Sequence, residues 1–197
     1  METEASKGHL VIKDCSICRM SDTLMVIAID IGTSYSCGFY SFRNDPKEIN
    51  AVEYFYDKVP TVVLFDKRKE FHSFGYKAVD NYKQLSDEEK RYWYYFKDFH
   101  KISNEHKPTE LEVTECSGKR LETYKVYGSI IKYFTDTMLT KLRRVINCDI
   151  GITRIRIHVV LIVPPVFSRS NKSMLQKAFS YESSFLWVGS LININFR

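Results

Sequence analysis

The spacing of apolar residues predicts a strand, a tight turn and a second strand near the start of the chain. Every residue from Leu24 to Ile29 is apolar, which indicates a buried strand that leaves the core at Asp30. The turn is predicted at Gly32-Thr33-Ser34, and residues 35–42 are expected to fold back on the first strand. The resulting hairpin carries a carboxylate, a glycine and two hydroxyl groups at its tip.

The same spacing divides the rest of the chain into alternating helices and strands. Strands are predicted at 51–56, 61–65 and 155–163, helices at 74–85, 86–99, 127–145 and 168–179, and a short hairpin or loop at 111–119. The segment 155–163 is the most apolar of the strands, so we expect it in the middle of a sheet.

The predicted helix at 86–99 begins with Ser86 and Glu89, the two residues of a capping box. Its aromatic residues recur three and four positions apart, which favours one buried stripe. Stacking on nucleic-acid bases or anchoring in a peptide pocket is the alternative. The stripe consists of Tyr92, Tyr95, Phe96 and Phe99.

The tip of the first hairpin has the chemistry that a polyphosphate needs. Backbone N–H groups of a glycine turn can form an anion nest, and Thr33 and Ser34 add hydroxyl donors. Asp30 offers an oxygen ligand, and Mg²⁺ is usually held by one or two carboxylates together with phosphates and water. The alternative is an ordinary hairpin with a polar turn.

Residues 28–37, Ala-Ile-Asp-Ile-Gly-Thr-Ser-Tyr-Ser-Cys, resemble the first phosphate motif of the 70 kDa heat-shock chaperones, members of the actin-like and sugar-kinase-like ATPase superfamily. Pro60–Val63, Phe74–Ala78 and Val159–Phe167 resemble the next strand, the start of a helix and a later strand of the same family. The aromatic run Tyr92–Phe96 and the Phe167 ending are similar to the 12A/12B-like branch.

The resemblance implies an α/β fold, namely the first lobe of an actin-like (ribonuclease H-like) ATPase, truncated, with a mixed β-sheet flanked by helices. It also implies binding of ATP or ADP with Mg²⁺, where Asp30 holds the metal through water. Lys101 is the candidate for the catalytic lysine of the family, although His100 falls where a lysine is usual. The nucleotide-binding residues implied by the motif are Asp30, Gly32, Thr33, Ser34 and Tyr35.

The resemblance covers Leu24 to Phe179, which divides the chain into three parts. We expect a flexible segment at 1–23, the lobe at 24–180 and a divergent apolar tail at 181–197. A lone lobe cannot surround a nucleotide, so ATP hydrolysis is expected to be weak or absent. The alternative is a non-catalytic interaction module that binds a protein partner or a full-length relative through its exposed cleft face or its apolar tail.

Composition excludes several other classes of protein. The chain has 197 residues, 44% of them hydrophobic, which is enough for a packed core, and its net charge of +5 is dispersed, which does not favour nucleic acid. No signal peptide or membrane span is predicted, and five scattered cysteines are typical of reduced thiols in the cytoplasm. Cys15 and Cys18 lack a second pair of ligands, so no zinc site is predicted.

Overall fold

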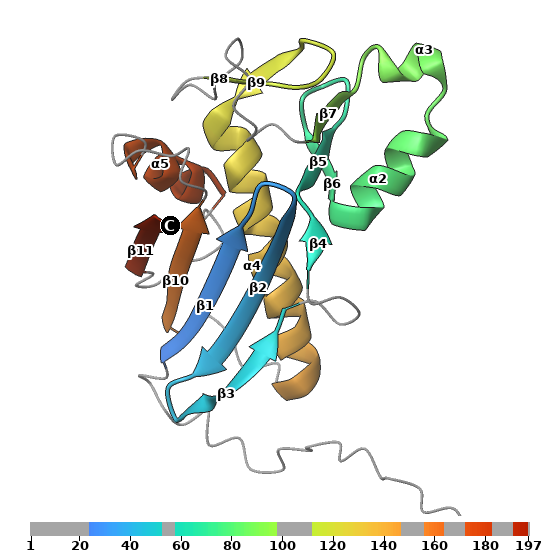
Figure 1. Ribbon diagram of the computed structural model, residues 1–197. Helices are drawn as coiled ribbons and strands as arrows, with labels where there is room; N and C mark the ends of the chain where they lie inside the picture. Colours follow the sequence, from blue (N-terminus) through green and yellow to red (C-terminus); the bar gives the residue numbers. More distant parts are fainter. Residues whose placement is uncertain are drawn as a thin grey trace, which may run out of the picture.

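The computed structural model describes residues 24–52, 58–97, 112–146, 156–163, 172–182 and 191–196 (Figure 1). Several sequence-based predictions lie outside these ranges. They are the flexible segment 1–23 with Cys15 and Cys18, and the candidate Lys101 with its neighbour His100.

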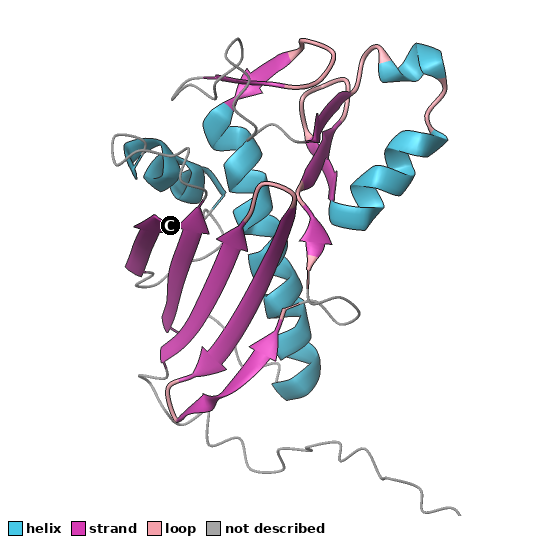
Figure 2. Cartoon of the chain, in the orientation of Figure 1, coloured by secondary structure: helices cyan, strands magenta, loops and turns pink. Residues whose placement is uncertain are grey.

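Within the described residues, the larger sheet has the order β11-β10-β1-β2-β3, with β4 also paired to β2. β1 is parallel to β10 and β10 to β11, whereas β2 is antiparallel to β1, β3 and β4. The predicted α/β class with a mixed sheet is therefore confirmed (Figure 2). The strands are β1 (Leu24–Ile31), β2 (Tyr35–Phe42), β3 (Asp45–Ala51), β4 (Val59–Pro60), β10 (Arg156–Val163) and β11 (Leu191–Phe196).

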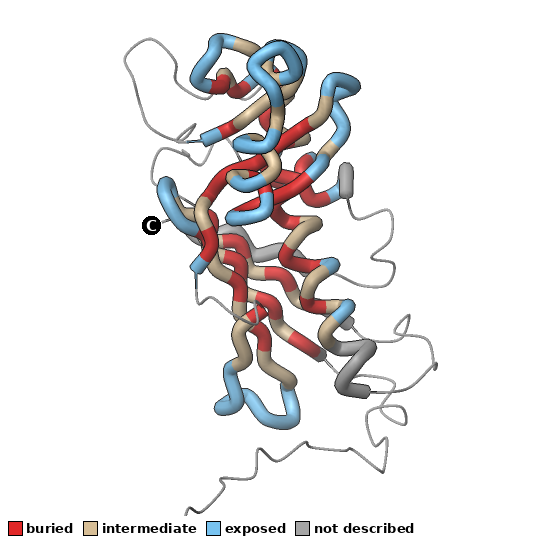
Figure 3. Tube along the Cα trace, turned by 90° about the vertical axis from the view of Figure 1, so that its right-hand side faces the viewer, coloured by how far each residue is buried: buried red, intermediate tan, exposed pale blue. Residues whose placement is uncertain are grey.

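Two helices cover one face of this sheet, α4 (Thr123–Ile146) and α5 (Lys172–Glu182) (Figure 1). Strand alternation places every second residue of β1 on that face, and those residues are fully buried. In Figure 3 buried and intermediate positions accordingly alternate along the strands. The core residues of β1 and α4 are Met25, Ile27, Ile29, Ile31, Val126, Tyr127, Ile130, Ile131, Phe134 and Met138.

A smaller sheet has the order β6-β5-β7, from β5 (Val62–Phe65), β6 (Phe71–Phe74) and β7 (Tyr94–Lys97). Helix α4 also packs against one face of the smaller sheet: the ring centroids of Phe74 in β6 and Phe134 in α4 are 5.7 Å apart. The other face of the smaller sheet is covered by α2 (Gly75–Gln84). There Tyr82 stacks on Tyr95, with 4.0 Å between the ring centroids. The hairpin β8 (Glu112–Thr114) and β9 (Arg120–Glu122) leads into α4.

The predicted helix at 86–99 is wrong over most of its length. The capping box of Ser86 and Glu89 is present, but α3 spans only Asp87–Lys90 and the aromatic run that follows is strand β7. Phe96 is buried in the main core, whereas Tyr95 lies on the opposite side against α2. Aromatic residues favour strands, and pairing with β5 decided the outcome over the helical spacing.

The predicted strand at 51–56 lies too late in the sequence. β3 begins at Asp45 because Phe42 pairs with Asp45, so that Arg43 and Asn44 form the turn. Pro46 is tolerated there because β3 lies at the edge of the sheet. Residues 53–57 lie outside the described ranges.

The other predicted elements agree with the structure to within a few residues. These are the first hairpin, the strands at 61–65 and 155–163, the helices at 74–85 and 127–145, the described part of the helix at 168–179, and the element at 111–119, which is a hairpin. Part of the predicted apolar tail forms β11, which pairs in parallel with β10. Among the helices of the described residues, none combines the length and the apolar composition of a membrane span.

Candidate phosphate-binding site

The turn between β1 and β2 depends on Gly32. Ile31 and Ser36 form the last residue pair of the hairpin, so residues 32–34 and the first residue of β2, Tyr35, lie beyond the paired part. A Cβ atom on Gly32 would lie 2.3 Å from the backbone oxygen of Tyr35, too close for any other residue without a change of the backbone. Thr33 and Ser34 are exposed at the tip, and Tyr35 is 54% exposed.

A buried residue from outside the hairpin fixes this turn from beneath. The Thr61 hydroxyl donates to the carbonyl oxygen of Gly32 at 2.8 Å and shares a second hydrogen bond of 2.8 Å with the Ser36 hydroxyl. The Thr61 N–H donates to the carbonyl of Ser34 at 2.9 Å. Thr61 and Ser36 are each only 1% exposed, so these bonds are shielded from water.

These bonds have a consequence for anion binding. Two of the carbonyl oxygens of the turn, those of Gly32 and Ser34, accept hydrogen bonds from Thr61. A carbonyl oxygen would repel a phosphate, whereas N–H and hydroxyl groups attract it. Thr61 thus fixes the turn through these two carbonyl oxygens, while Thr33 and Ser34, which carry the hydroxyl groups, are exposed.

The strand β4 completes the support of the turn. Pro60 pairs with Tyr35 and Val59 pairs with Ser36. Gly75, the first residue of α2, has a φ of +65° and packs close to Val59. The predicted motifs at Pro60–Val63 and Phe74–Ala78 therefore both lie next to the hairpin.

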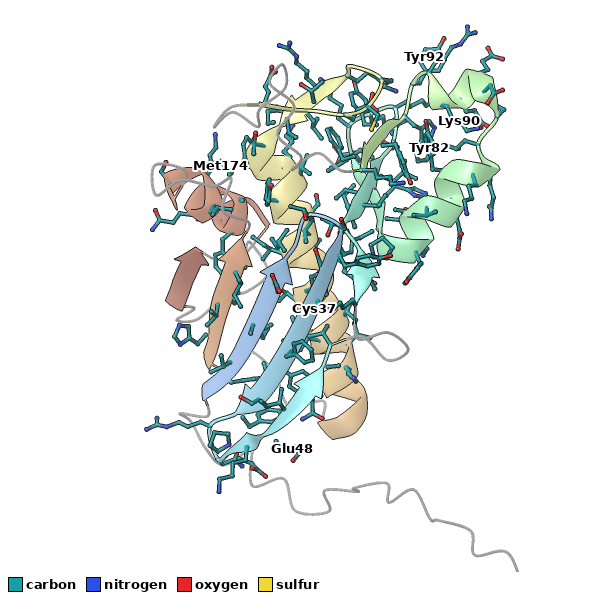
Figure 4. All side chains as sticks on the ribbon, viewed as in Figure 1. Cys37, Glu48, Tyr82, Lys90, Tyr92 and Met174 are labelled. Carbon is teal, nitrogen blue, oxygen red and sulfur yellow. The ribbon has the colours of Figure 1, made fainter. Side chains whose placement is uncertain are left out.

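Asp30 lies on the face of the sheet opposite to α4. It pairs with Cys37 of β2 on one side and with Ile162 of β10 on the other, and its side chain is half-buried. Cys37, labelled in Figure 4, lies on β2 on this same face, because directly paired residues point the same way. Asp30 is close in sequence to the turn, as a ligand of a phosphate-bound metal would be.

The residues present fit a magnesium ion that also binds phosphate. Asp30 offers carboxylate oxygens and Thr33 and Ser34 offer exposed hydroxyls, which are oxygen ligands of the kind that Mg²⁺ accepts. In the described ranges, no group of three or more His, Cys, Asp or Glu side chains could hold a metal ion. The remaining Mg²⁺ ligands would therefore be phosphate oxygens and water.

Lys97, which lies close to His100 and Lys101 in the sequence, is the one of these three residues that the structure describes. Lys97 is exposed at the end of β7 and pairs with Val62, the neighbour of Thr61. The prediction of a helix at 86–99 concealed this pairing.

Comparisons with known proteins bear on this arrangement. No protein-family model matches the chain. Heat shock 70 kDa protein 12A of Mus musculus and of Homo sapiens are each 27% identical to it, over 188 and 189 residues, or 89% of this chain. Heat shock 70 kDa protein 12B of Homo sapiens is 30% identical over 166 residues, or 78% of this chain.

The chain spans about a quarter of the length of these relatives, namely 27% of 12A and 24% of 12B. Among solved structures, MreB5 of Spiroplasma citri bound to ADP gives a TM-score of 0.49 at 10% identity, covering 87% of this chain and 38% of MreB5. A non-polymerising mutant of MamK bound to AMPPNP gives a TM-score of 0.38 at 14% identity, and the match covers 86% of this chain and 40% of MamK.

The described residues form an α/β lobe in which a buried threonine supports a glycine turn. In sequence, most of the chain is similar to heat shock 70 kDa proteins 12A and 12B. The resemblance to the 70 kDa heat-shock family, predicted from the residues of the hairpin, and to its 12A/12B-like branch, predicted from Tyr92–Phe96 and Phe167, is confirmed.

Proposed function

We propose that this chain is a nucleotide-binding lobe of the heat shock 70 kDa protein 12A/12B type that binds ATP or ADP with Mg²⁺. Gly32, Thr33, Ser34 and Tyr35 bind the phosphates through N–H and hydroxyl groups, and Asp30 holds Mg²⁺ through water. The observation that carries the proposal is the contact of Thr61 with Gly32 and Ser34, which fixes the carbonyls and leaves Thr33 and Ser34 exposed. A chaperone-like role in the cytoplasm is part of the same proposal.

In this proposal the positive charge of a lysine offsets the negative charge of the bound phosphates. The resemblance nominates Lys101, and the pairing of β7 with β5 adds Lys97. Either ammonium group would attract the terminal phosphate, since a point charge suits phosphate binding. Substituting each lysine in turn would show which of the two contributes.

Hydrolysis by this chain alone is expected to be weak or absent. Phosphoryl transfer depends on groups placed around the transferring phosphate from several directions. The described site approaches a nucleotide from one side, through one turn and one carboxylate. We therefore propose binding as the property of this chain and leave hydrolysis to an assembly that supplies the opposite wall of the site.

The test is the melting temperature of the chain with and without millimolar Mg-ATP. A ligand that binds only the folded state stabilises it, by about 2.7 kcal/mol at a concentration of 100 times Kd. Asp30→Ala should abolish the rise in melting temperature, and Asp80→Ala, which removes an exposed carboxylate of α2, should not. No rise for the wild-type chain would contradict the proposal.

A second function, that of a protein-interaction module, is favoured by one observation. Within the described residues no helix covers the face of the larger sheet opposite to α4 (Figures 1 and 3). That face includes the half-buried residues Ala28, Phe39 and Val160. A parallel sheet is normally covered on both faces, so this face suits a protein surface. A chain that forms dimers or binds its relative without nucleotide would support this function.

A further inference from the structure

The turn between β5 and β6 presents consecutive cations on a fixed backbone. The Asp66 carboxylate accepts hydrogen bonds from the N–H of Arg68 at 2.8 Å and from the N–H of Glu70 at 2.9 Å. The N–H of Lys69 donates to the carbonyl oxygen of Asp66 at 3.0 Å, and Lys69 has a φ of +65°. Glycine is the usual residue at such a left-handed position, so these bonds hold the lysine there. Lys67, Arg68 and Lys69 are all exposed on this turn.

Two of these cations have no carboxylate partner among the described residues. The Lys69 ammonium group lies 5.8 Å from the centroid of the Tyr94 ring, whereas the side chains of Lys67 and Arg68 take part in no ion pair or ring contact there. Cations of α3 and of the β8–β9 hairpin are instead paired within the molecule, as Lys90 is with Asp87, Lys119 with Glu115 and Arg120 with Glu112. Lys67 and Arg68 are thus available to carboxylates of another molecule.

Exposed carboxylates lie at the same end of the smaller sheet. β5 ends at Phe65, which pairs with Tyr94 at the start of β7, and α3 comes shortly before β7. The β5–β6 turn and α3 therefore both lie at this end, as Figure 1 shows. In α3 the Asp87 side chain is 99% exposed, and Glu88 is exposed and makes no ion pair with the described residues.

An exposed aromatic side chain lies at this end as well. Tyr92, labelled in Figure 4, belongs to the short connection between α3 and β7 and is 61% exposed. Tyrosine and arginine are enriched among the residues that contribute most to binding at protein interfaces, and charged groups suit the rim of an interface. This end of the smaller sheet thus combines free cations, free carboxylates and an exposed ring.

We propose that this end of the smaller sheet is the interface of a dimer formed by two copies of this chain. Its residues are Lys67, Arg68, Asp87, Glu88 and Tyr92. In a two-fold dimer the same surface of both copies meets, so the cations of each copy face the carboxylates of the other and every contact occurs twice. A membrane or a nucleic acid carries one sign of charge, and the α3 carboxylates would repel it. The dimer requires no nucleotide and is therefore independent of the proposed function.

Sedimentation equilibrium of the full chain tests for the dimer. Exposed ion pairs are individually weak, so we expect monomer and dimer to coexist at about 100 µM chain and low salt. The Debye length falls from about 30 Å at 0.01 M salt to about 3 Å at 1 M, so the Kd of the dimer should rise about tenfold or more over this range. A chain that stays monomeric at low salt, or a Kd that salt does not change, would overturn the proposal.

Reversing the charges identifies the contact. The variant with Lys67→Glu and Arg68→Glu, and the variant with Asp87→Lys and Glu88→Lys, should each raise the Kd about tenfold or more, because like charges then face each other. An equimolar mixture of the two variants should associate with about the Kd of the wild-type chain, since opposite charges face each other again at both contacts. A mixture that associates no better than the separate variants would overturn the proposal.

Two controls separate this contact from other causes of association. The variant with Arg43→Glu and Lys47→Glu changes the net charge by the same amount at exposed positions near the β2–β3 turn, and it should leave the Kd unchanged. Phe39→Ala, on the face of the larger sheet opposite to α4, should leave it unchanged as well. An equal rise in Kd for either control would overturn the proposal.

The ring of Tyr92 has a test of its own. Tyr92→Ser should raise the Kd about tenfold while the dependence of the Kd on salt stays as in the wild-type chain, because no charge is removed. An unchanged Kd would contradict the central place of this ring. If the variant with Asp87→Lys and Glu88→Lys does not fold, Glu88→Lys alone is mixed with Lys67→Glu, and the same rescue is expected.

Discussion

Replacing Thr61 with valine tests the support of the turn directly. Valine keeps the branched shape of threonine and removes the hydroxyl, which makes two hydrogen bonds of 2.8 Å with Gly32 and Ser36 at a site 1% exposed. Each bond contributes about 1 kcal/mol, and a buried group left without its partner adds a cost of about 1–3 kcal/mol. We expect the free energy of unfolding to fall by about 3–5 kcal/mol.

Urea unfolding with linear extrapolation measures this loss. Thr61→Ser is the matched control, because it retains the hydroxyl and should lose clearly less than the valine variant. The Ser36→Ala change should couple with Thr61→Val, since the two hydroxyls share one hydrogen bond, and the double variant should lose less than the sum of the single ones. A loss below about 0.5 kcal/mol, or equal losses for valine and serine, would refute the reasoning.

Three further predictions concern packing and titration. Gly38→Ala should cost about 1–3 kcal/mol in urea unfolding, because its Cβ would lie 2.7 Å from Cδ1 of Phe134. Burial raises the pKa of Tyr127 well above 10.0. The unfolded chain therefore loses this proton first, and the stability falls by up to about 1.4 kcal/mol per pH unit above pH 10. Tyr127→Phe should remove this dependence of stability on pH, and an unchanged dependence would contradict the prediction. The backbone hydrogen bond from Ser86 lowers the pKa of Glu89 below 4.5, so that the contribution of the capping box is lost as the pH falls through the lowered pKa. In Ser86→Ala, NMR titration should find the Glu89 pKa closer to 4.5.

The first hairpin could be predicted from the sequence because its signals are local. A run of apolar residues, a carboxylate and a glycine turn lie within a few positions of one another. The inner face of β2 could not be predicted in the same way. The apolar residues of this strand, Tyr35, Cys37, Phe39 and Phe42, show no clean alternation in the sequence, and its core side holds Ser36 and Gly38, among others. Small residues are needed there because Thr61 and Phe134 approach closely.

The second lesson concerns the aromatic run at 92–96. Its spacing satisfies a helix, and its aromatic composition equally suits a strand. Only the partner strand β5 decides between them, and that pairing joins residues about thirty positions apart. The same distance in sequence hid the role of Thr61, which bonds to Gly32 and Ser34 of the turn from another segment of the chain.

The most direct test of the central claim is an NMR titration of the isotopically labelled chain with Mg-ADP. The account predicts that the largest shifts occur at the backbone amides of residues 32–36, with smaller ones at Thr61 and Lys97, and that Gly32→Ala suppresses them. Shifts that are absent, or that concentrate on the open sheet face around Phe39 and leave residues 32–36 unchanged, would contradict it.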